Sequence, residues 1–372
     1  MKIAIVGDVM LGGILSSNFE KYKNISLSHK IRKLLEADIT FCNLECPIAR
    51  IGDPITHNKI LLYAQEKSIE LLKTGFNAVS LANNHIMDFG SNSLLKTIKL
   101  LEEKNIKHVC AGQNLFEARK PIFFNKNGLK VVFLAYVAPE TWGGWSQRKE
   151  QTHKILFANK NKAGVAPFNL NYIKEDISKI KNSSDFIVIS IHWGDEYTYF
   201  PNPEIISDAH KIIDFGANLV VGHHPHVLQG YEEYHSGLIM YSLSNFLFSP
   251  YFDDKSIVKI HHKSRIGAIL QCNITKNKIL NHKLVPTLQK KKEPIVINPS
   301  SKTKNKILRK IQFLSSEYQK DNYQTRYIKL KEKENRFKHI RLILETIEMY
   351  GLVYLFKKIW ILVFRNNKNR KV

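Results

Sequence analysis

Short apolar runs alternate with longer segments of helical spacing along the first 289 of the 372 residues. Runs such as residues 186–191, with one polar position in six, are typical of strands buried on both faces of a sheet. Such runs predict ten strands, at residues 2–6, 39–42, 78–81, 107–110, 131–137, 186–191, 219–221, 238–242, 268–274 and 279–285. Helical spacing predicts helices near residues 28–36, 67–74, 91–104, 170–181 and 203–215. This alternation predicts an α/β fold in which helices cover the sheets.

A change of composition after residue 289 predicts a domain boundary. Residues 1–289 are expected to form one α/β domain, 290–303 a linker and 304–372 a basic helical region. From residue 290 onward there are 22 Lys and Arg against 7 Asp and Glu, so +15 of the net charge of +23 lies there. Such a region can face anionic lipid or an anionic polymer. Nucleic acid is not an expected partner, because the sequence offers neither a groove-reading motif nor aromatic residues interleaved with the basic ones.

The two ends of the chain bear on its location. The apolar run at residues 3–6 is shorter than the roughly 7–15 residues of a signal peptide, so we expect a cytoplasmic protein. Residues 340–364 are strongly apolar, but Lys357 and Lys358 interrupt them, so we do not expect them to span a membrane. Peripheral contact with the inner face of the membrane, and packing against the domain or a second subunit, both fit this segment. The four cysteines lack CxxC spacing and are expected to be reduced.

Polar residues gather where five of the predicted strands end. Because ligands of open α/β sheets bind outside the carboxyl ends of strands, we expect these side chains to meet in the folded protein. The residues concerned are Asp8, Glu45, Asn84, His85, Asp88, His192, Glu196, His223, His224 and His226. Carboxylate, amide oxygen and imidazole together suit a divalent ion such as Zn²⁺, Mn²⁺ or Fe²⁺. The sequence therefore predicts a metal site, and residues 140–166 predict a long loop. Whether this loop closes over the site is left open by the sequence.

Each of these residues alone has a simpler explanation. Asp8 can cap a turn, Asn84 and Asp88 can cap the helix that begins near residue 91, and His192 can be a core histidine. Five separate strand ends with the same kinds of ligand are harder to obtain from caps alone. The recurrence therefore favours one shared site.

Seven stretches of the sequence resemble, in order and spacing, the CapA family of capsule and poly-γ-glutamate synthesis proteins. They are GDVML (7–11), NLECPI (43–48), GFNAVSLANNHIMDFG (75–90), AGQNLFEARKPI (111–122), IHWGDEY (191–197), FGANLVVGHHPHVLQGYE (215–232) and YSLSNFLFS (241–249). The family's domain is similar to the calcineurin-like metallophosphoesterases. The resemblance spans residues 1–285 and implies a core of two packed mixed sheets flanked by helices, with the site at strand ends on one edge.

The resemblance also implies roles for individual residues. By similarity to metallophosphoesterases, two metals are expected, and their ligands would be Asp8, Glu45, Asn84, His192, His224 and His226. His85 matches the catalytic histidine of that superfamily, a proton donor beside the metals. Asp88 and Glu196 belong to the CapA-like pattern without a clear metallophosphoesterase counterpart, and we expect them to face the substrate or to support the ligands.

Two departures from the metallophosphoesterase pattern leave the number of metals open. Met10 stands where a metal-binding histidine is usual, and a thioether is a poor ligand for a hard metal. Glu45 stands where aspartate is usual. One ion and two ions therefore both fit the sequence, and which two of His223, His224 and His226 bind metal is open as well.

Two functions fit these residues. In the first, the protein is a metal-dependent hydrolase of a phosphoester or polymer amide in capsule or poly-γ-glutamate-type biosynthesis, with an anionic polymer or phosphoester as substrate. A hydroxide activated by the metal would attack, and His85 would protonate the leaving group. In the second, it is a non-hydrolytic metal-binding component of a polymer synthesis or export assembly, with polymer synthases as partners. Met10 favours the second function, whereas Asn84 and His85 favour the first.

Overall fold

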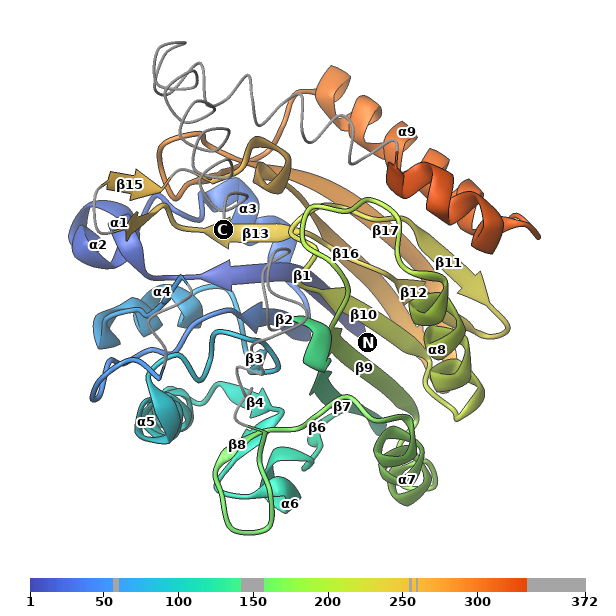
Figure 1. Cartoon of the computed structure of the whole chain (residues 1–372), viewed down its shortest axis with the longest axis horizontal. Helices are drawn as coiled ribbons and strands as arrows, with labels where there is room; N and C mark the ends of the chain where they lie inside the picture. Colours follow the sequence, from blue (N-terminus) through green and yellow to red (C-terminus); the bar gives the residue numbers. More distant parts are fainter. Residues whose placement is uncertain (56–59, 142–156, 254–255, 259, 333–372) are drawn as a thin grey trace, which may run out of the picture. The chain divides into compact units, whose positions relative to one another are not determined.

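The computed structural model describes residues 1–332 except 56–59, 142–156, 254–255 and 259 (Figure 1). Contacts divide the chain into two compact units, Met1–Lys320 and Asp321–Val372. Both of the large sheets belong to the first unit. The apolar segment 340–364 and most of the predicted loop at 140–166 lie outside the described residues.

The first sheet has eight strands and is built around β1 (Lys2–Met10). Parallel strands β2, β3 and β4 follow on one side, and antiparallel strands β16, β17 and β18 on the other. Their bounds are Ile39–Leu44, Ala78–Ser80, Lys107–Val109, Ile266–Thr275, Lys278–Gln289 and Val296–Ile297. On its second side β1 changes neighbours: residues 2–5 pair with β16, whereas residues 8–10 pair in parallel with β13 (Asn245–Phe248). The carboxyl end of β1 thus lies beside a strand from a distant part of the chain.

The second sheet has six strands in the order β11, β12, β10, β9, β7 and β6. The four central strands are parallel, and the two outer ones pair antiparallel with their neighbours. In the same order, their bounds are Tyr231–Tyr234, Gly237–Met240, Leu219–His223, Phe186–His192, Leu129–Val137 and Ile122–Lys126. Every residue of β9 is buried, as its apolar sequence predicts for a central parallel strand.

The two sheets pack face to face. Phe41 of β2 stacks on Phe133 of β7 with ring centroids 4.8 Å apart, and both side chains are fully buried. Helices α3, α4 and α5 lie beside the first sheet, and α7 and α8 beside the second (Figure 1). Their bounds are His29–Leu35, Ile69–Lys73, Gly90–Glu103, Leu170–Ile180 and Pro203–Asp214. The structure therefore shows the expected α/β core of two sheets flanked by helices.

The remaining described elements are short and connect the larger ones. They are α1 (Gly13–Ser17), α2 (Phe19–Tyr22), α6 (Leu115–Ala118), β5 (Ala111–Gly112), β8 (Gly164–Val165), β14 (Tyr251–Asp253), β15 (Ser256–Val258), η1 (Glu66–Ser68), η2 (Pro139–Thr141) and η3 (His262–Arg265). All ten predicted strands and all five predicted helices are present, with somewhat different ends. Within the described part of the chain, the structure has no helix of the length and apolarity needed to cross a membrane.

Helix α9 (Ser301–Tyr318) contacts β17 and β11, one strand from each sheet (Figure 1). The hydroxyl of Ser300 caps it by accepting a hydrogen bond from Thr303 N. The buried side of α9 includes Ile307, Ile311, Leu314 and Tyr318. Residues 290–303, which the sequence presents as a linker, contain β18 and the start of α9, and the division by contacts falls after Lys320.

Candidate metal centre

Five strand ends, from both sheets, meet at one point of the core. In the first sheet, Asp8 lies near the end of β1, and Glu45 and Asn84 follow β2 and β3. In the second sheet, His192 is the last residue of β9, and residues 223–226 begin at the last residue of β10. Asp8, Glu45 and His192 are fully shielded from solvent. Neighbouring parallel strands end at the same edge of a sheet, so motifs that are far apart in the sequence form one site.

One group of donor atoms comes from Asp8, Glu45 and His192, and these atoms lie within 4.8 Å of one another. His192 Nε2 is 3.5 Å from Glu45 Oε1 and 3.1 Å from Asn84 Oδ1. Asn84 presents its oxygen to His192 because its Nδ2 donates to the carbonyl oxygen of Thr141, at 3.0 Å. Carboxylate, amide and imidazole donors therefore face one another, a set that suits Mn²⁺, Fe²⁺ or Zn²⁺.

A second group of donor atoms comes from Glu45, His224 and His226, again within 4.8 Å, so Glu45 belongs to both groups. The ring centroid of His224 is 4.7 Å from that of His192 and 5.8 Å from that of His226. His224 and His226 have φ angles of 93° and 53°, in the left-handed region that residues with a Cβ rarely adopt. Backbone strain of this kind concentrates at functional sites, where the surrounding fold maintains it.

His223 takes a different position from the other two histidines of this turn. Its Nδ1 lies 3.3 Å from Asp8 Oδ1, and it belongs to neither donor group. His226 Nδ1 lies 3.1 Å from the other oxygen of Asp8 and 2.7 Å from Asn245 Oδ1. All three histidines of this turn therefore reach the site. Among these three, His224 and His226 share a donor group with Glu45, and His223 does not.

The burial of these groups shifts their pKa values in opposite directions. Burial alone raises the pKa of Asp8, but hydrogen bonds and charge from two neighbouring histidines outweigh it and hold that pKa well below its usual range. Burial, followed by the charge of Asp8, raises the pKa of Glu45 well above its usual range. Burial lowers the pKa of His192 well below its usual range and that of His224 to about 4. For His226, the hydrogen bond with Asp8 overcomes burial and raises the pKa to about 10.

Several buried atoms of the site support a bound cation. Among the described residues, Glu45 Oε1, His223 Nε2 and His224 Nδ1 have no hydrogen-bond partner. A buried polar atom without a partner costs about 1–3 kcal/mol, and a cation that accepts these lone pairs removes that cost. Imidazoles must be neutral to bind a metal, and the lowered pKa values of His192 and His224 keep them so at neutral pH. The residues present therefore fit a divalent metal.

His85 belongs to neither donor group. Its side chain is 13% exposed, whereas that of Asp88 is fully buried, and His85 Nδ1 lies 2.8 Å from Asp88 Oδ2. The same carboxylate oxygen accepts a hydrogen bond from Leu62 N at 2.8 Å. Since a carboxylate only accepts, Nδ1 carries the proton and the orientation of the ring is fixed. This pair is suited to proton transfer at a partly exposed position.

Glu196 and Met10 complete the positions that the sequence singled out. Glu196 is half-buried in the loop after β9. Burial lowers the pKa of His226, whereas Asp8, then Glu45 and last Glu196 raise it. Met10 is fully buried, and its sulfur lies 3.1 Å from Gly12 N. The thioether is thus in contact with the backbone of the following loop.

Three asparagines that the sequence pattern does not single out support the ligands. Asn43 Nδ2 donates to Asp8 Oδ1 at 2.8 Å and also to a carboxylate oxygen of Glu45. Asn83 Nδ2 donates to Asn43 Oδ1 at 3.1 Å. Asn245 of β13 pairs directly with Asp8 of β1. The available signal is position: each asparagine lies inside a family-like motif and next to an apolar strand.

Gly7 makes the approach of β13 to the site possible. A Cβ at this position would lie 1.6 Å from the carbonyl oxygen of Ser244, which is closer than any real contact. With glycine there, Asp8 N donates to the same carbonyl oxygen at 2.9 Å. The Gly-Asp pair at the end of the first strand therefore serves chain packing as well as the site.

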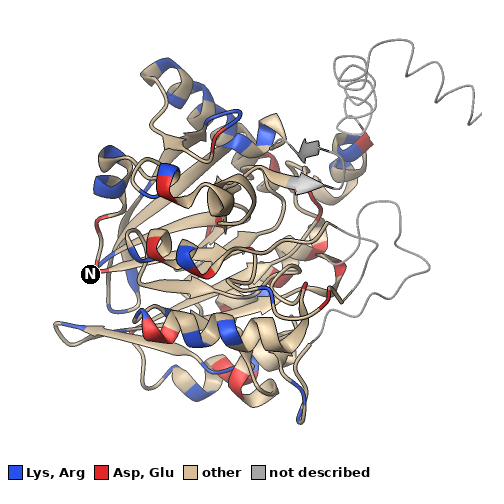
Figure 2. Cartoon of the chain, turned by 90° about the vertical axis from the view of Figure 1, so that its left-hand side faces the viewer, with Lys and Arg blue, Asp and Glu red and all other residues tan. Residues whose placement is uncertain are grey.

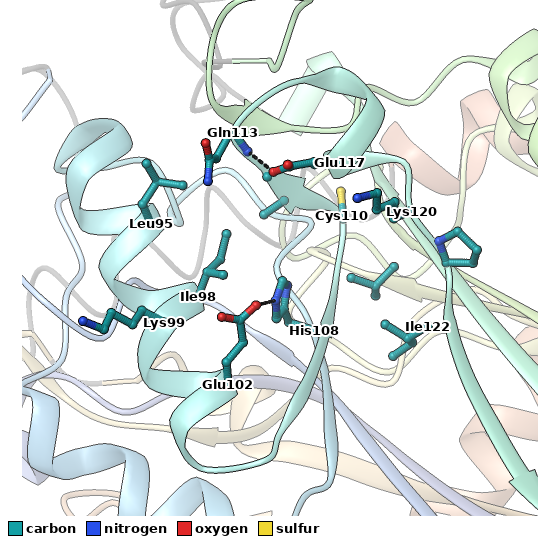
Figure 3. Close-up of a pocket in the computed structure, with 14 residues that line it drawn as sticks. Leu95, Ile98, Lys99, Glu102, His108, Cys110, Gln113, Glu117, Lys120 and Ile122 are labelled. Atoms are coloured by element: carbon teal, nitrogen blue, oxygen red, sulfur yellow. Dashed lines mark hydrogen bonds and ion pairs between the residues drawn. The ribbon is translucent and has the colours of Figure 1, made fainter.

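A cavity of about 750 Å³ lies elsewhere in the unit, where residues of α5, β4 and the segment 110–122 surround it (Figure 3). None of its described lining residues is a predicted ligand. Its polar groups interact with one another: His108 Nε2 is 3.5 Å from Glu102 Oε1, and Gln113 N donates to Glu117 Oε2 at 2.9 Å (Figure 3). Because these polar groups already have partners in the protein, they do not indicate a bound ligand. We therefore assign the cavity no function.

The fold and the site together define a two-sheet α/β protein with buried carboxylate, amide and imidazole donors at its strand ends. The chain belongs to the bacterial capsule synthesis protein PGA_cap family, whose model matches residues 2–250. All of the predicted ligands fall within that match.

Individual proteins give further comparisons. The capsule biosynthesis protein CapA of Bacillus anthracis is 31% identical over 283 residues, which is 73% of this chain and 66% of that protein. The chain therefore spans slightly less than two thirds of that relative. The PGA biosynthesis protein CapA of Bacillus subtilis strain 168 is 28% identical over 315 residues, 84% of this chain and 77% of that protein. Among solved structures, a hypothetical protein from Thermus thermophilus is 13% identical with a TM-score of 0.46, over 78% of this chain and 100% of that one.

Proposed function

We propose that this protein is a metal-dependent hydrolase that cleaves a phosphoester or amide bond of an anionic polymer, or of a polymer precursor, during synthesis of a capsule or poly-glutamate-type polymer. The observation that carries the proposal is the convergence of two donor groups on Glu45, together with the His85–Asp88 pair, whose histidine is close enough to His224 to affect its pKa. The names of the two related proteins, which refer to capsule and PGA biosynthesis, support the polymer.

The two donor groups would hold one or two ions of Mn²⁺, Fe²⁺ or Zn²⁺. Such an ion supplies Lewis acidity: it lowers the pKa of water and stabilises charge on a phosphoryl or carbonyl oxygen. His85 donates a proton to the leaving group, and Asp88 holds its ring in place. Asn43 keeps the carboxylates of Asp8 and Glu45 in register through its amide nitrogen.

The charge of the protein supports an anionic substrate. Residues 1–289 carry a net +8, which raises the local concentration of a polyanion. Figure 2 shows Lys and Arg on several helices and loops, with Asp and Glu among them. Positive charge dispersed in this way is better suited to attracting a long polyanion to the protein than to recognising one small anionic group.

We propose polymer synthases as partners and the inner face of the cytoplasmic membrane as the location. The support for the location is the charge of +15 in residues 290–372, since clustered basic residues bind anionic lipid. A chain lacking residues 321–372 should lose its association with vesicles that contain phosphatidylglycerol, whereas a membrane role elsewhere in the chain would leave it intact.

Met10 favours a second function. Its side chain is buried against Gly12 N, so the position where metallophosphoesterases have a ligand is used for packing. On this basis the protein would be a non-hydrolytic component of a polymer synthesis or export assembly, with the metal in a structural or ligand-binding role.

The test is elemental analysis of protein purified without chelator, together with hydrolysis assays in added Mn²⁺. An aryl phosphodiester and a γ-linked glutamate oligomer serve as substrates. One or two ions per chain together with turnover of either substrate would support the hydrolase and identify the bond type. Bound metal without turnover of either would favour the non-hydrolytic component, and a chain without metal would contradict both proposals.

A further inference from the structure

Tyr318, the last residue of α9, connects two loops through its hydroxyl group. The hydroxyl donates a hydrogen bond to the carbonyl oxygen of Tyr199 at 2.9 Å and accepts one from Gly230 N at 2.8 Å. The side chain is 5% exposed, and its ring packs edge to face on Tyr241 with centroids 5.3 Å apart. A buried hydroxyl that satisfies backbone groups of two separate segments fixes their separation.

The two loops are those that leave the candidate metal centre. Tyr199 lies in the loop after β9 that also carries Glu196, and Gly230 follows the turn that contains His224 and His226. The loops are joined directly as well. Tyr197 N donates to the carbonyl oxygen of Pro225 at 2.7 Å, and Gln229 Nε2 donates to that of Thr198 at 2.9 Å.

Helix α9 fits these loops closely. A Cβ on Gly230 would lie 2.6 Å from Ser315 N and 2.7 Å from Tyr318 Cε2, so only glycine fits. Ser315 Oγ accepts a hydrogen bond from Tyr231 N at 2.9 Å. On the other loop, Lys310 Nζ lies 3.1 Å from the centroid of the Tyr199 ring. Lys310, Ser315 and Tyr318, all in the second half of α9, therefore contact the two loops.

We propose that Tyr318 is a positioning residue of the metal centre, and that α9 holds the loops after β9 and β10 in the geometry that presents Glu196, His224 and His226. The match to the family model ends at residue 250, so this part of the site is supplied by a region outside the matched domain. The inference rests on the proposed function in one respect, the presence of a metal at these histidines.

The test compares the full-length protein with its Tyr318→Phe variant, which keeps the ring and removes both hydrogen bonds. Tyr172→Phe is the matched control, because the Tyr172 ring lies 4.0 Å from the guanidinium of Arg119, away from the site. Amide hydrogen exchange is measured for peptides that cover residues 195–201 and 223–231, and the Kd for Mn²⁺ by calorimetry. For Tyr318→Phe we expect about tenfold faster exchange, confined to these two peptides. We also expect a Kd for Mn²⁺ that is roughly tenfold larger, with little change in melting temperature.

Three results would overturn the inference: unchanged exchange in both peptides, faster exchange throughout the molecule, or local exchange with an unchanged Kd for Mn²⁺. The first would show that the loops do not depend on the hydroxyl. The second would show a general structural role, and the third would show that loop position does not affect the metal. If the wild-type protein binds none of Mn²⁺, Fe²⁺ and Zn²⁺, the proposed function fails, while the exchange data still decide whether Tyr318 fixes the loops. Gly230→Ala displaces α9 from the other side and should give the same local exchange pattern.

Discussion

His192 Nε2 lies 3.1 Å from Asn84 Oδ1, although the two residues are 108 positions apart and follow strands of different sheets. The contact is possible only because the sheets pack face to face, with Phe41 and Phe133 stacked between them. Neither sheet alone holds a complete donor group. The site is therefore a product of sheet packing. Changes at the site should alter the stability of the protein as well as its activity.

Removal of the metal should destabilise the protein. Without a cation, Asp8 and Glu45 remain buried together, and burial with the charge of Asp8 keeps the pKa of Glu45 raised. A ligand at about 100 times its Kd stabilises a fold by roughly 2.7 kcal/mol. We expect chelation to lower the melting temperature by about 5 °C and Mn²⁺ to restore it. An unchanged melting temperature in protein shown to have lost bound metal would contradict a buried site.

Metal affinity should rise with pH. The pKa of His226 is raised to about 10 and that of Glu45 is raised as well, so the metal-free site holds protons at neutral pH. Those protons must leave before the groups can bind metal, so higher pH favours the metal-bound state. With one proton released, Kd should fall about tenfold per pH unit between roughly pH 6.5 and 8.5. Calorimetry with Mn²⁺ in buffers of different ionisation heat counts the protons, and a Kd independent of pH would rule out this protonation scheme.

His85→Ala should lower turnover without lowering metal content. His85 belongs to neither donor group, and its contact with Asp88 suits a proton donor. Loss of a general acid reduces kcat by about 10²- to 10⁴-fold. His210→Ala is the control, since His210 of α8 pairs with Glu232 at 2.9 Å and takes no part in the donor groups. Loss of metal from His85→Ala would instead indicate that His85 binds the metal. Unchanged turnover would exclude His85 as the general acid.

The ten predicted strands and the positions of the predicted ligands follow from local sequence, because a buried parallel strand has a distinctive apolar run and ends at the site edge. Strands β6, β11, β13 and β18 were not predicted. Other features depend on distant partners. The pairing of β1 with β13 places Asn245 beside Asp8, and no local pattern encodes that pairing. The different roles of His223 and His224 depend on the φ angle of His224, which is 93°. The turn adopts this conformation only when it is packed in the folded protein, so local sequence does not predict it.

The family-like stretch at 111–122 has a structural explanation that points to a further prediction. Arg119 Nε and Nη2 each donate to the carboxylate of Asp176 at 2.8 Å, and Tyr136 Oη donates to the same carboxylate at 2.9 Å. Arg119→Ala leaves Asp176 buried without its cation and should cost about 2–3 kcal/mol of unfolding free energy, with metal content retained. Lys179→Ala is the control, because Lys179 is 69% exposed and 3.7 Å from the same carboxylate. Chemical denaturation measures both, and equal values for the two variants would show that the buried network contributes nothing.

Helix α9 illustrates where composition misleads. Its lysines give it the character of a solvated tail, yet Ile307, Ile311 and Leu314 are spaced for one buried helix face. The sequence predicts a helix there, but its basic composition assigns that helix to a separate region. The buried spacing is the signal that identifies α9 as part of the first unit.

Chains that end at Pro299 and at Lys320 should therefore behave differently. The shorter chain loses α9 and the burial of Ile307, Ile311 and Leu314, each worth about 1.5–3 kcal/mol. Their sum is comparable with the whole stability of a typical domain, roughly 5–15 kcal/mol, so this chain should melt at a much lower temperature or aggregate. The chain that ends at Lys320 keeps the first compact unit and should retain metal and a cooperative transition. Similar melting temperatures for the two chains would show that α9 is dispensable. Membrane binding by the tail is best measured by truncation at Lys320, because truncation at Pro299 also removes Tyr318 from the site.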